Sequence, residues 1–127
     1  MRYWKFDVVN LLGDYHVNEN AVVELKLQLR LAKNEKKNPL VDTDRDMLDR
    51  RIQQIECKIQ EYQMYVDMVT LGFDVLSEEE RHLLEWLYID KIEPAEVMTR
   101  LEIKSSKKFK ERVNNAMRNF IKVSSPL

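Results

Sequence analysis

The sequence predicts an all-α protein in which an N-terminal antiparallel helical hairpin, similar to a coiled coil, precedes a C-terminal helix-turn-helix lobe. Only two glycines and three prolines occur in 127 residues, which leaves few places for β-turns. Charged residues make up 34% of the chain, and Leu, Glu, Lys, Arg and Gln, which lose little side-chain freedom in a helix, are abundant. Apolar residues also recur at helical spacing. We therefore expect the hairpin over residues 1–75 and the helix-turn-helix lobe over residues 76–127.

The first predicted helix spans about Tyr3 to Leu12. Trp4, Val8 and Leu12 lie four residues apart and so share one face of such a helix. We expect this face to pack into the core, because aromatic side chains supply much of the core of small domains. Gly13 should end the helix, since glycine accepts a left-handed backbone conformation.

The second predicted helix lies between Asn18 and Lys36, with Asn18 or Asn20 as its N-cap. The alternation of leucines between residues 25 and 31 also fits the two-residue period of a strand. A helix is favoured because that run contains no β-branched residue and consists of poor strand formers. The apolar positions of the helix are Val22, Leu25, Leu29 and Ala32.

The third predicted helix carries the most regular pattern in the chain. Pro39 separates it from the preceding helix, and Thr43 or Asp44 is its expected N-cap. Gly72 is expected to interrupt it. The pattern is an apolar seam along one face of the helix, and such a seam needs a partner. We expect the partner to be the second helix folded back on it, with any remaining length covered by the C-terminal lobe or by a second subunit. The seam recurs at alternating spacings of four and three residues and comprises Leu48, Ile52, Ile55, Ile59, Tyr62, Val66, Val69 and Phe73.

The C-terminal region opens on a helix-start signal. Ser77 is followed three residues later by Glu80, which is the pattern of a capping box. The helix should run to about Tyr88. Glu78 and Glu79, with Glu80, complement the positive end of the helix dipole; an acidic contact with a polymerase is the alternative role for these three glutamates.

A short support helix and a longer final helix follow. Pro94 suits a first helical turn, and the support helix should extend from Ala95 to Leu101. Ser105 or Ser106 is the expected N-cap of the final helix. The apolar sector of that helix comprises Phe109, Val113, Ala116, Met117 and Phe120.

Charge is unevenly distributed along the chain. The segment from Thr99 to Lys122 contains eight basic residues and two acidic ones, Glu102 and Glu111, which gives it a net charge of +6. The whole chain carries −1. The rest of the chain therefore carries −7. A concentrated positive charge on a helix that follows a support helix and a turn predicts binding to double-stranded DNA.

Other function classes have little support in the sequence. The single cysteine, Cys57, has no partner for an internal disulfide, and the two histidines, His16 and His82, are too far apart in sequence to suggest a zinc site. No glycine-rich phosphate loop or catalytic cluster is present, so we expect neither an enzyme nor a cofactor or metal. No apolar run approaches the roughly 20 residues that cross a bilayer, and we expect a cytoplasmic protein without a membrane partner.

A set of residues spread over the three C-terminal helices forms a further pattern. It comprises Leu76, Glu80, Arg81, Leu84, Leu87 and Tyr88, then Glu96, Val97, Leu101 and Ile103, then Phe109, Asn114, Ala116, Met117 and Phe120. Through these residues the segment from Leu76 to Phe120 resembles region four of bacterial sigma factors and, more closely, the C-terminal part of the ArpU/RinA-like phage regulators of late transcription. Glu102 stands where that family usually has glycine, and Met98 where it usually has alanine. The resemblance implies a transcriptional regulator of phage or prophage origin that acts on late-gene promoters in a bacterial host, with host RNA polymerase as a further partner.

The expected DNA contacts fall into two groups. Side chains at the exposed start of the final helix should meet base edges, because Asn, Glu and Lys match the donors and acceptors of adenine, cytosine and guanine. A second group should contact phosphates and contribute affinity without sequence information. The base-reading group is Ser106, Lys107, Lys110, Glu111 and Asn114, and the phosphate group is Lys104, Lys108, Asn115, Arg118 and Lys122.

Two rival functions fit the same pattern. A DNA-packaging adaptor such as a small terminase subunit also joins a DNA-binding helical lobe to a hairpin, and it would form a ring through its N-terminal helices. A protein-interaction module would instead present its basic face to an acidic partner. Homo-oligomerisation through the N-terminal helices is compatible with the transcriptional regulator and with the DNA-packaging adaptor.

Overall fold

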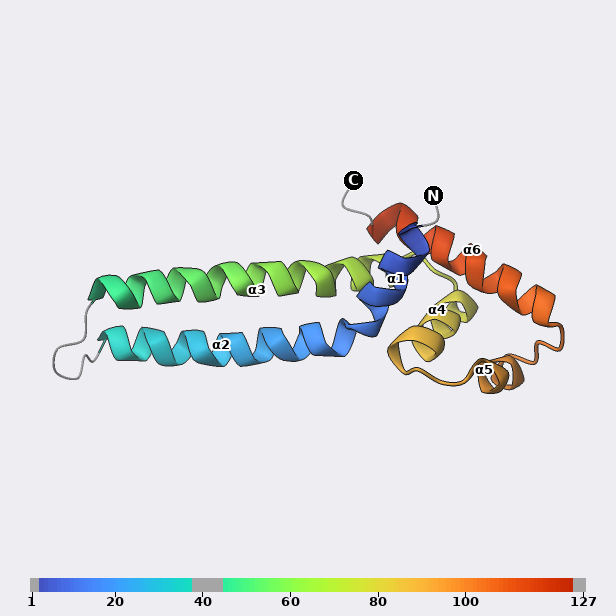
Figure 1. Ribbon diagram of the computed structural model, residues 1–127, viewed down its shortest axis with the longest axis horizontal. Coiled ribbons are helices and arrows are strands. Elements are labelled where there is room, and N and C mark those ends of the chain that lie inside the picture. The colour runs from blue at the N-terminus through green and yellow to red at the C-terminus, as the bar shows by residue number, and fades with distance from the viewer. Residues whose placement is uncertain (1–2, 38–44, 125–127) are drawn as a thin grey trace. The chain divides into compact units, whose positions relative to one another are not determined.

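The computed structural model describes residues 3–37 and 45–124, with side chains described for 7–37 and 45–122, and every regular element in these ranges is a helix. This confirms the predicted all-α class. The expected core position of Trp4, the break at Pro39 and the caps at Thr43 or Asp44 lie outside the described residues or side chains. The elements are α1 (Tyr3–Gly13), α2 (Tyr15–Lys37), α3 (Arg45–Asp74), α4 (Glu78–Leu84), the π-helical turn η1 (Glu85–Ile89), α5 (Pro94–Arg100) and α6 (Ser106–Ser124) (Figure 1).

The chain forms two compact units. Unit 1 takes the described residues of Met1–His16 and Asp67–Leu127, and unit 2 takes those of Val17–Val66. The boundaries of unit 2 fall inside α2 and α3, so they do not coincide with the predicted boundary between residues 75 and 76.

In unit 2, α2 and α3 run alongside each other in opposite directions (Figure 1). Val22 and Ala32 of α2 and Leu48 and Ile55 of α3 are buried, and the other seam positions of unit 2 are half-buried. The heptad spacing therefore marks the covered face of α3 correctly. An ion pair between Lys36 and Asp49 joins the end of α2 to the beginning of α3.

The predicted start of the second helix is wrong. The helix begins at Tyr15, so Asn18 lies inside it, where only 8% of the residue is exposed. The reason is that α1 ends at Gly13 and a single residue, Asp14, separates the two helices. Gly13 ends α1 as expected, but it does so without the left-handed backbone conformation that we expected there.

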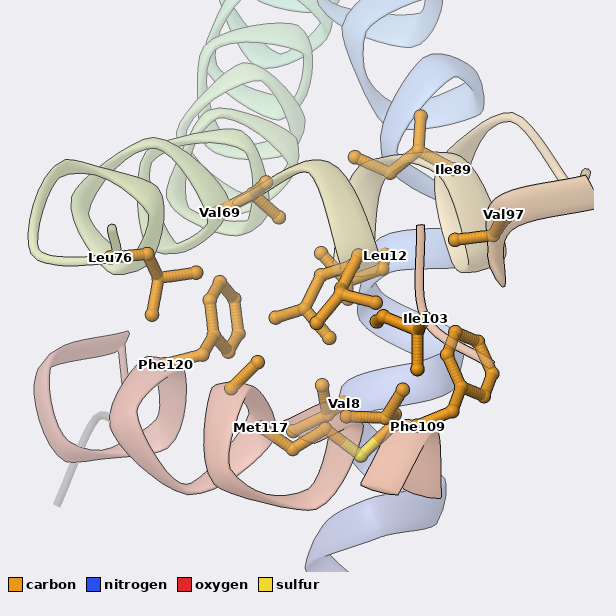
Figure 2. Packing of buried hydrophobic residues seen from close by; sticks show 14 residues of the cluster. Val8, Leu12, Val69, Leu76, Ile89, Val97, Ile103, Phe109, Met117 and Phe120 are labelled. Atoms are coloured by element: carbon orange, nitrogen blue, oxygen red, sulfur yellow. The ribbon is translucent and has the colours of Figure 1, made fainter. Parts of the chain in front are cut away.

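The core of unit 1 is built from both ends of the chain. Figure 2 shows Val8 and Leu12 of α1 in the same cluster as Met117 and Phe120 of α6. Leu12 and Phe120 are fully buried. The remaining buried members are Val69, Leu76, Leu83, Leu84, Ile89, Val97, Ile103, Phe109, Val113 and Ala116.

Gly72 has a different role from the predicted one. It is buried within α3, which continues to Asp74, so it does not interrupt the helix. A Cβ at position 72 would lie 2.3 Å from two ring atoms of Phe120. That ring also packs edge-to-face on Phe73, with 5.8 Å between the ring centroids. Glycine is needed here because α3 and α6 approach closely.

Candidate nucleic-acid interface

Helix α6 has one buried and one exposed face. Its five predicted apolar residues are all buried, which places the basic residues on the opposite side. Nine of the ten predicted DNA contacts are exposed, namely Lys104, Ser106, Lys107, Lys108, Lys110, Glu111, Asn115, Arg118 and Lys122, and Asn114 is half-buried. Lys104 lies in the turn before α6, and the other nine lie on the helix.

The start of α6 is capped by Ser105. Its hydroxyl oxygen accepts a hydrogen bond from the Lys108 amide at 3.3 Å, as expected of an N-cap. Ser106, the other candidate, is the first residue of the helix and is exposed. This leaves the Ser106 side chain at the beginning of the basic face.

The turn between α5 and α6 has a glutamate in the left-handed backbone conformation. Glu102 has a φ of 57°. The Ile103 amide donates to the Met98 carbonyl at 2.9 Å, and the Glu102 amide donates to the Thr99 carbonyl at 3.2 Å. These two bonds form a Schellman motif. The turn therefore keeps a left-handed residue at this position even without glycine.

One edge of α6 is attached to α4. The Arg112 guanidinium donates a hydrogen bond to Glu79 at 2.6 Å, and the Asn119 amide donates to Glu80 at 2.7 Å. Two of the three glutamates that were candidates for a polymerase contact thus hold the basic helix in place. Their carboxylates also make this edge of α6 less attractive to phosphate.

Glu80 has several simultaneous partners. Its carboxylate accepts from the Ser77 amide at 3.1 Å, and its own amide donates to the Ser77 hydroxyl at 3.2 Å, which completes the predicted capping box. Partial burial raises the pKa of Glu80, but the hydrogen bonds from Ser77 and Asn119 outweigh burial, and the net pKa lies below its ordinary value.

The opposite edge of α6 borders a groove of about 480 Å³. Lys110 and Asn114 lie on the α6 side of this groove, and Lys91 and Glu93 lie on the other side. Apolar side chains complete it, together with Tyr88, whose hydroxyl pKa is raised by burial. The apolar lining comprises Leu87, Ile92, Pro94, Phe109 and Val113.

Lys91 is a residue of this groove that sequence reasoning missed. It is exposed and has a φ of 56°. The Ile92 amide, which follows it, donates to the Trp86 carbonyl at 2.8 Å and so closes the end of η1. No local motif signals this lysine, because its proximity to α6 arises from packing.

A stack of three side chains connects the support helix to η1. The rings of His82 and Trp86 are parallel, with centroids 4.5 Å apart, and the Arg100 guanidinium lies 5.1 Å from the centroid of the Trp86 ring. Arg100 also pairs with Glu96 at 3.1 Å. Cation–π contact of this kind favours a fixed position for α5 beside η1.

The described part of the chain has neither a metal-binding cluster nor a membrane-spanning helix. No group of three or more His, Cys, Asp or Glu side chains there is arranged to hold a metal ion. None of the described helices combines the length and the apolar character that a membrane span requires. Comparisons of the chain with protein-family models, with curated proteins and with solved structures gave no match.

Proposed function

We propose that this protein is a sequence-specific DNA-binding transcriptional regulator, of phage or prophage origin, that acts on late-gene promoters. In this proposal α5 and α6 are the two helices of a helix-turn-helix, and α6 enters the major groove. The observation that carries the proposal is the exposed basic face of α6 opposite a fully apolar buried face. The capped start of α6 and the Schellman turn before it support the same geometry.

The side chains of α6 divide by position. Lys107, Glu111 and Asn114 lie within the first turns of the helix, where recognition helices meet base edges. Arg118 and Lys122 lie farther along the helix and supply phosphate contacts. Asn114 is the best position at which to test base reading, since a half-buried amide has a more defined orientation than an exposed lysine side chain.

The antiparallel hairpin of α2 and α3 serves self-association or contact with host RNA polymerase. Large hydrophobic side chains exposed on a small helical unit favour a partner surface. In the described part of unit 2 these are Val17, Val23, Leu27, Leu31, Met47 and Met64. Self-association would place two copies of α6 on one DNA molecule, which suits a two-fold symmetric site.

The experiment is a titration of the full chain against random duplexes and against duplexes from phage late promoters at two salt concentrations. We expect binding that weakens with salt and one preferred fragment. Replacing both Lys107 and Asn114 with Ala should lower the affinity for the preferred fragment by about 30-fold or more, at roughly 1–3 kcal/mol for each of the two base contacts. Equal losses on preferred and random DNA would contradict base reading by these residues.

The solution mass of the same sample separates this function from its rivals. A monomer or dimer that binds DNA fits a transcriptional regulator. A ring well above a dimer would instead favour the DNA-packaging adaptor. Absence of binding to every duplex at low salt would leave the protein-interaction module.

A further inference from the structure

We infer that the groove between α6 and the segment joining η1 to α5 receives one sugar-phosphate strand of the DNA, and that Lys91 contacts a phosphate of that strand. This inference rests on the proposed function and adds a contact that lies outside the helix-turn-helix sequence. It starts from the observation that Lys91 and Lys110 line the same groove from opposite elements.

The dimensions of DNA require a strand on each side of the reading helix. A helix with its side chains is about 10–12 Å across, and the major groove is about 12 Å wide. An inserted α6 therefore fills the groove, and the two phosphate strands pass along its two edges. The two edges of α6 differ in charge and in shape.

The edge toward α4 is occupied by acidic groups. Glu79 and Glu80 bond Arg112 and Asn119 there, so two potential donors of α6 already have protein partners. The edge toward η1 has the opposite character. Lys110 and Asn114 border an open groove there, and Lys91 lies across from them.

The chemistry of the groove suits a phosphodiester strand. Lys91 and Lys110 are both exposed, and neither forms an ion pair with another described residue. Glu93 is the one acidic residue in the lining, so the lining carries a net positive charge. The hydroxyl of Tyr88 is protonated at neutral pH, because the ordinary pKa of tyrosine is about 10 and burial raises the pKa of Tyr88 further. This hydroxyl is therefore a hydrogen-bond donor. The apolar lining offers contact for deoxyribose.

The experiment measures how the affinity of the full chain for one duplex falls as salt rises. Each phosphate contact contributes about 0.9 to the slope of log affinity against log salt. Lys91→Gln should therefore reduce that slope by about 0.9, on random and preferred duplexes alike. Equivalently, a fourfold rise in salt should cost the wild type about 3.5-fold more affinity than the variant. Lys91→Arg, which keeps the charge, should retain the wild-type slope.

Two controls separate a lost contact from a damaged fold. Lys91→Gly removes the charge with the residue best suited to a φ of 56°, and it should give the same loss of slope with an unchanged melting temperature. Lys58→Gln removes an exposed lysine of α3 in unit 2 and should leave the slope unchanged.

The outcomes distinguish this inference from the function on which it rests. If the wild type binds DNA and Lys91→Gln keeps the full slope, the groove does not hold a strand and the inference is overturned. If the wild type binds no duplex, the proposed function itself fails. A loss confined to the preferred duplex would assign Lys91 to base reading and would also overturn the phosphate contact.

Discussion

A side chain at position 72 would occupy space that the Phe120 ring already fills. Gly72→Ala brings a methyl group to within 2.3 Å of that ring, and Phe120 is fully buried. Overpacking of a core costs about 1–3 kcal/mol, against about 1 kcal/mol gained from the helix propensity of alanine. We expect a net fall in the free energy of unfolding, measured by urea denaturation.

Gly13→Ala is the matched control for this substitution. A Cβ at position 13 would meet only the Tyr88 carbonyl oxygen, at an ordinary 3.9 Å, so stability should change little. In a Phe120→Leu background, Gly72→Ala should lower the free energy of unfolding by less than it does in the wild type. Leucine is smaller than phenylalanine and has no ring, so the effects of the two sites are coupled. Equal stability of Gly72→Ala and Gly13→Ala would contradict the close approach of α3 and α6.

Residues such as Gly72 and Asn18 show where sequence reasoning ends. Glycine and asparagine usually signal helix ends, because their local backbone preferences are strong. Here Gly72 is needed for a tertiary contact, and Asn18 lies inside a helix that resumes directly after Asp14. Neither fact can be derived from neighbours in sequence.

At the scale of elements, repeated sequence patterns predicted the buried faces of helices better than single residues predicted helix ends. The seam of α3 extends over several heptads, so it identifies the covered face without knowledge of the partner. The apolar sector of α6 and the capping box of Ser77 and Glu80 are likewise local and were predicted correctly. The groove was not predicted, because residues 91 and 110 are brought together only when α6 packs beside η1.

The attachment of α6 to α4 gives a pH-dependent prediction. The pKa of Glu80 is lower in the folded chain than in the unfolded chain, so its stabilising effect is present above the ordinary glutamate pKa of 4.5 and is lost as pH falls through the folded-state value. Glu80→Gln keeps the capping-box geometry but removes the charge. Since Glu80 is only half-buried and solvent still screens its carboxylate, we expect a loss of only about 0.5 kcal/mol at pH 7.

Thermal denaturation between pH 7 and pH 3 tests this effect. The melting temperatures of the wild type and of Glu80→Gln should converge as pH falls through the folded-state pKa of Glu80, because Glu80 is then protonated in both the folded and the unfolded chain. Glu78→Gln is the control, because Glu78 is exposed on the same turn. A difference between wild type and Glu80→Gln that stays constant across this range would contradict the role of the charge.

At the scale of the whole molecule, the composition of unit 1 predicts how the chain tolerates truncation. Val8, Leu12 and Val69 belong to the core cluster but lie outside residues 76–127. A fragment of residues 76–127 therefore lacks the part of the core that α1 and α3 supply. We expect this fragment to lose cooperative thermal unfolding, followed by near-ultraviolet circular dichroism, because removing several large buried side chains costs a few kcal/mol each.

The full chain with Val8→Ala and Leu12→Ala serves as the companion variant for this test. It should unfold cooperatively at a lower temperature than the wild type, because it creates cavities without removing a helix. If the fragment of residues 76–127 melted like the full chain, the contribution of α1 to the core would be negligible.

The assembly of unit 1 from both ends of the chain also affects how the protein is made. On the ribosome, α1 is synthesised well before its partners η1 and α6. Val8 and Leu12 stay exposed until then, while α2 and α3 can already pair through contacts that are closer in sequence. Because contacts between distant residues slow folding, closure of unit 1 should be the slow step, and nascent chains that stall before α6 should be targets for chaperones that bind exposed apolar segments.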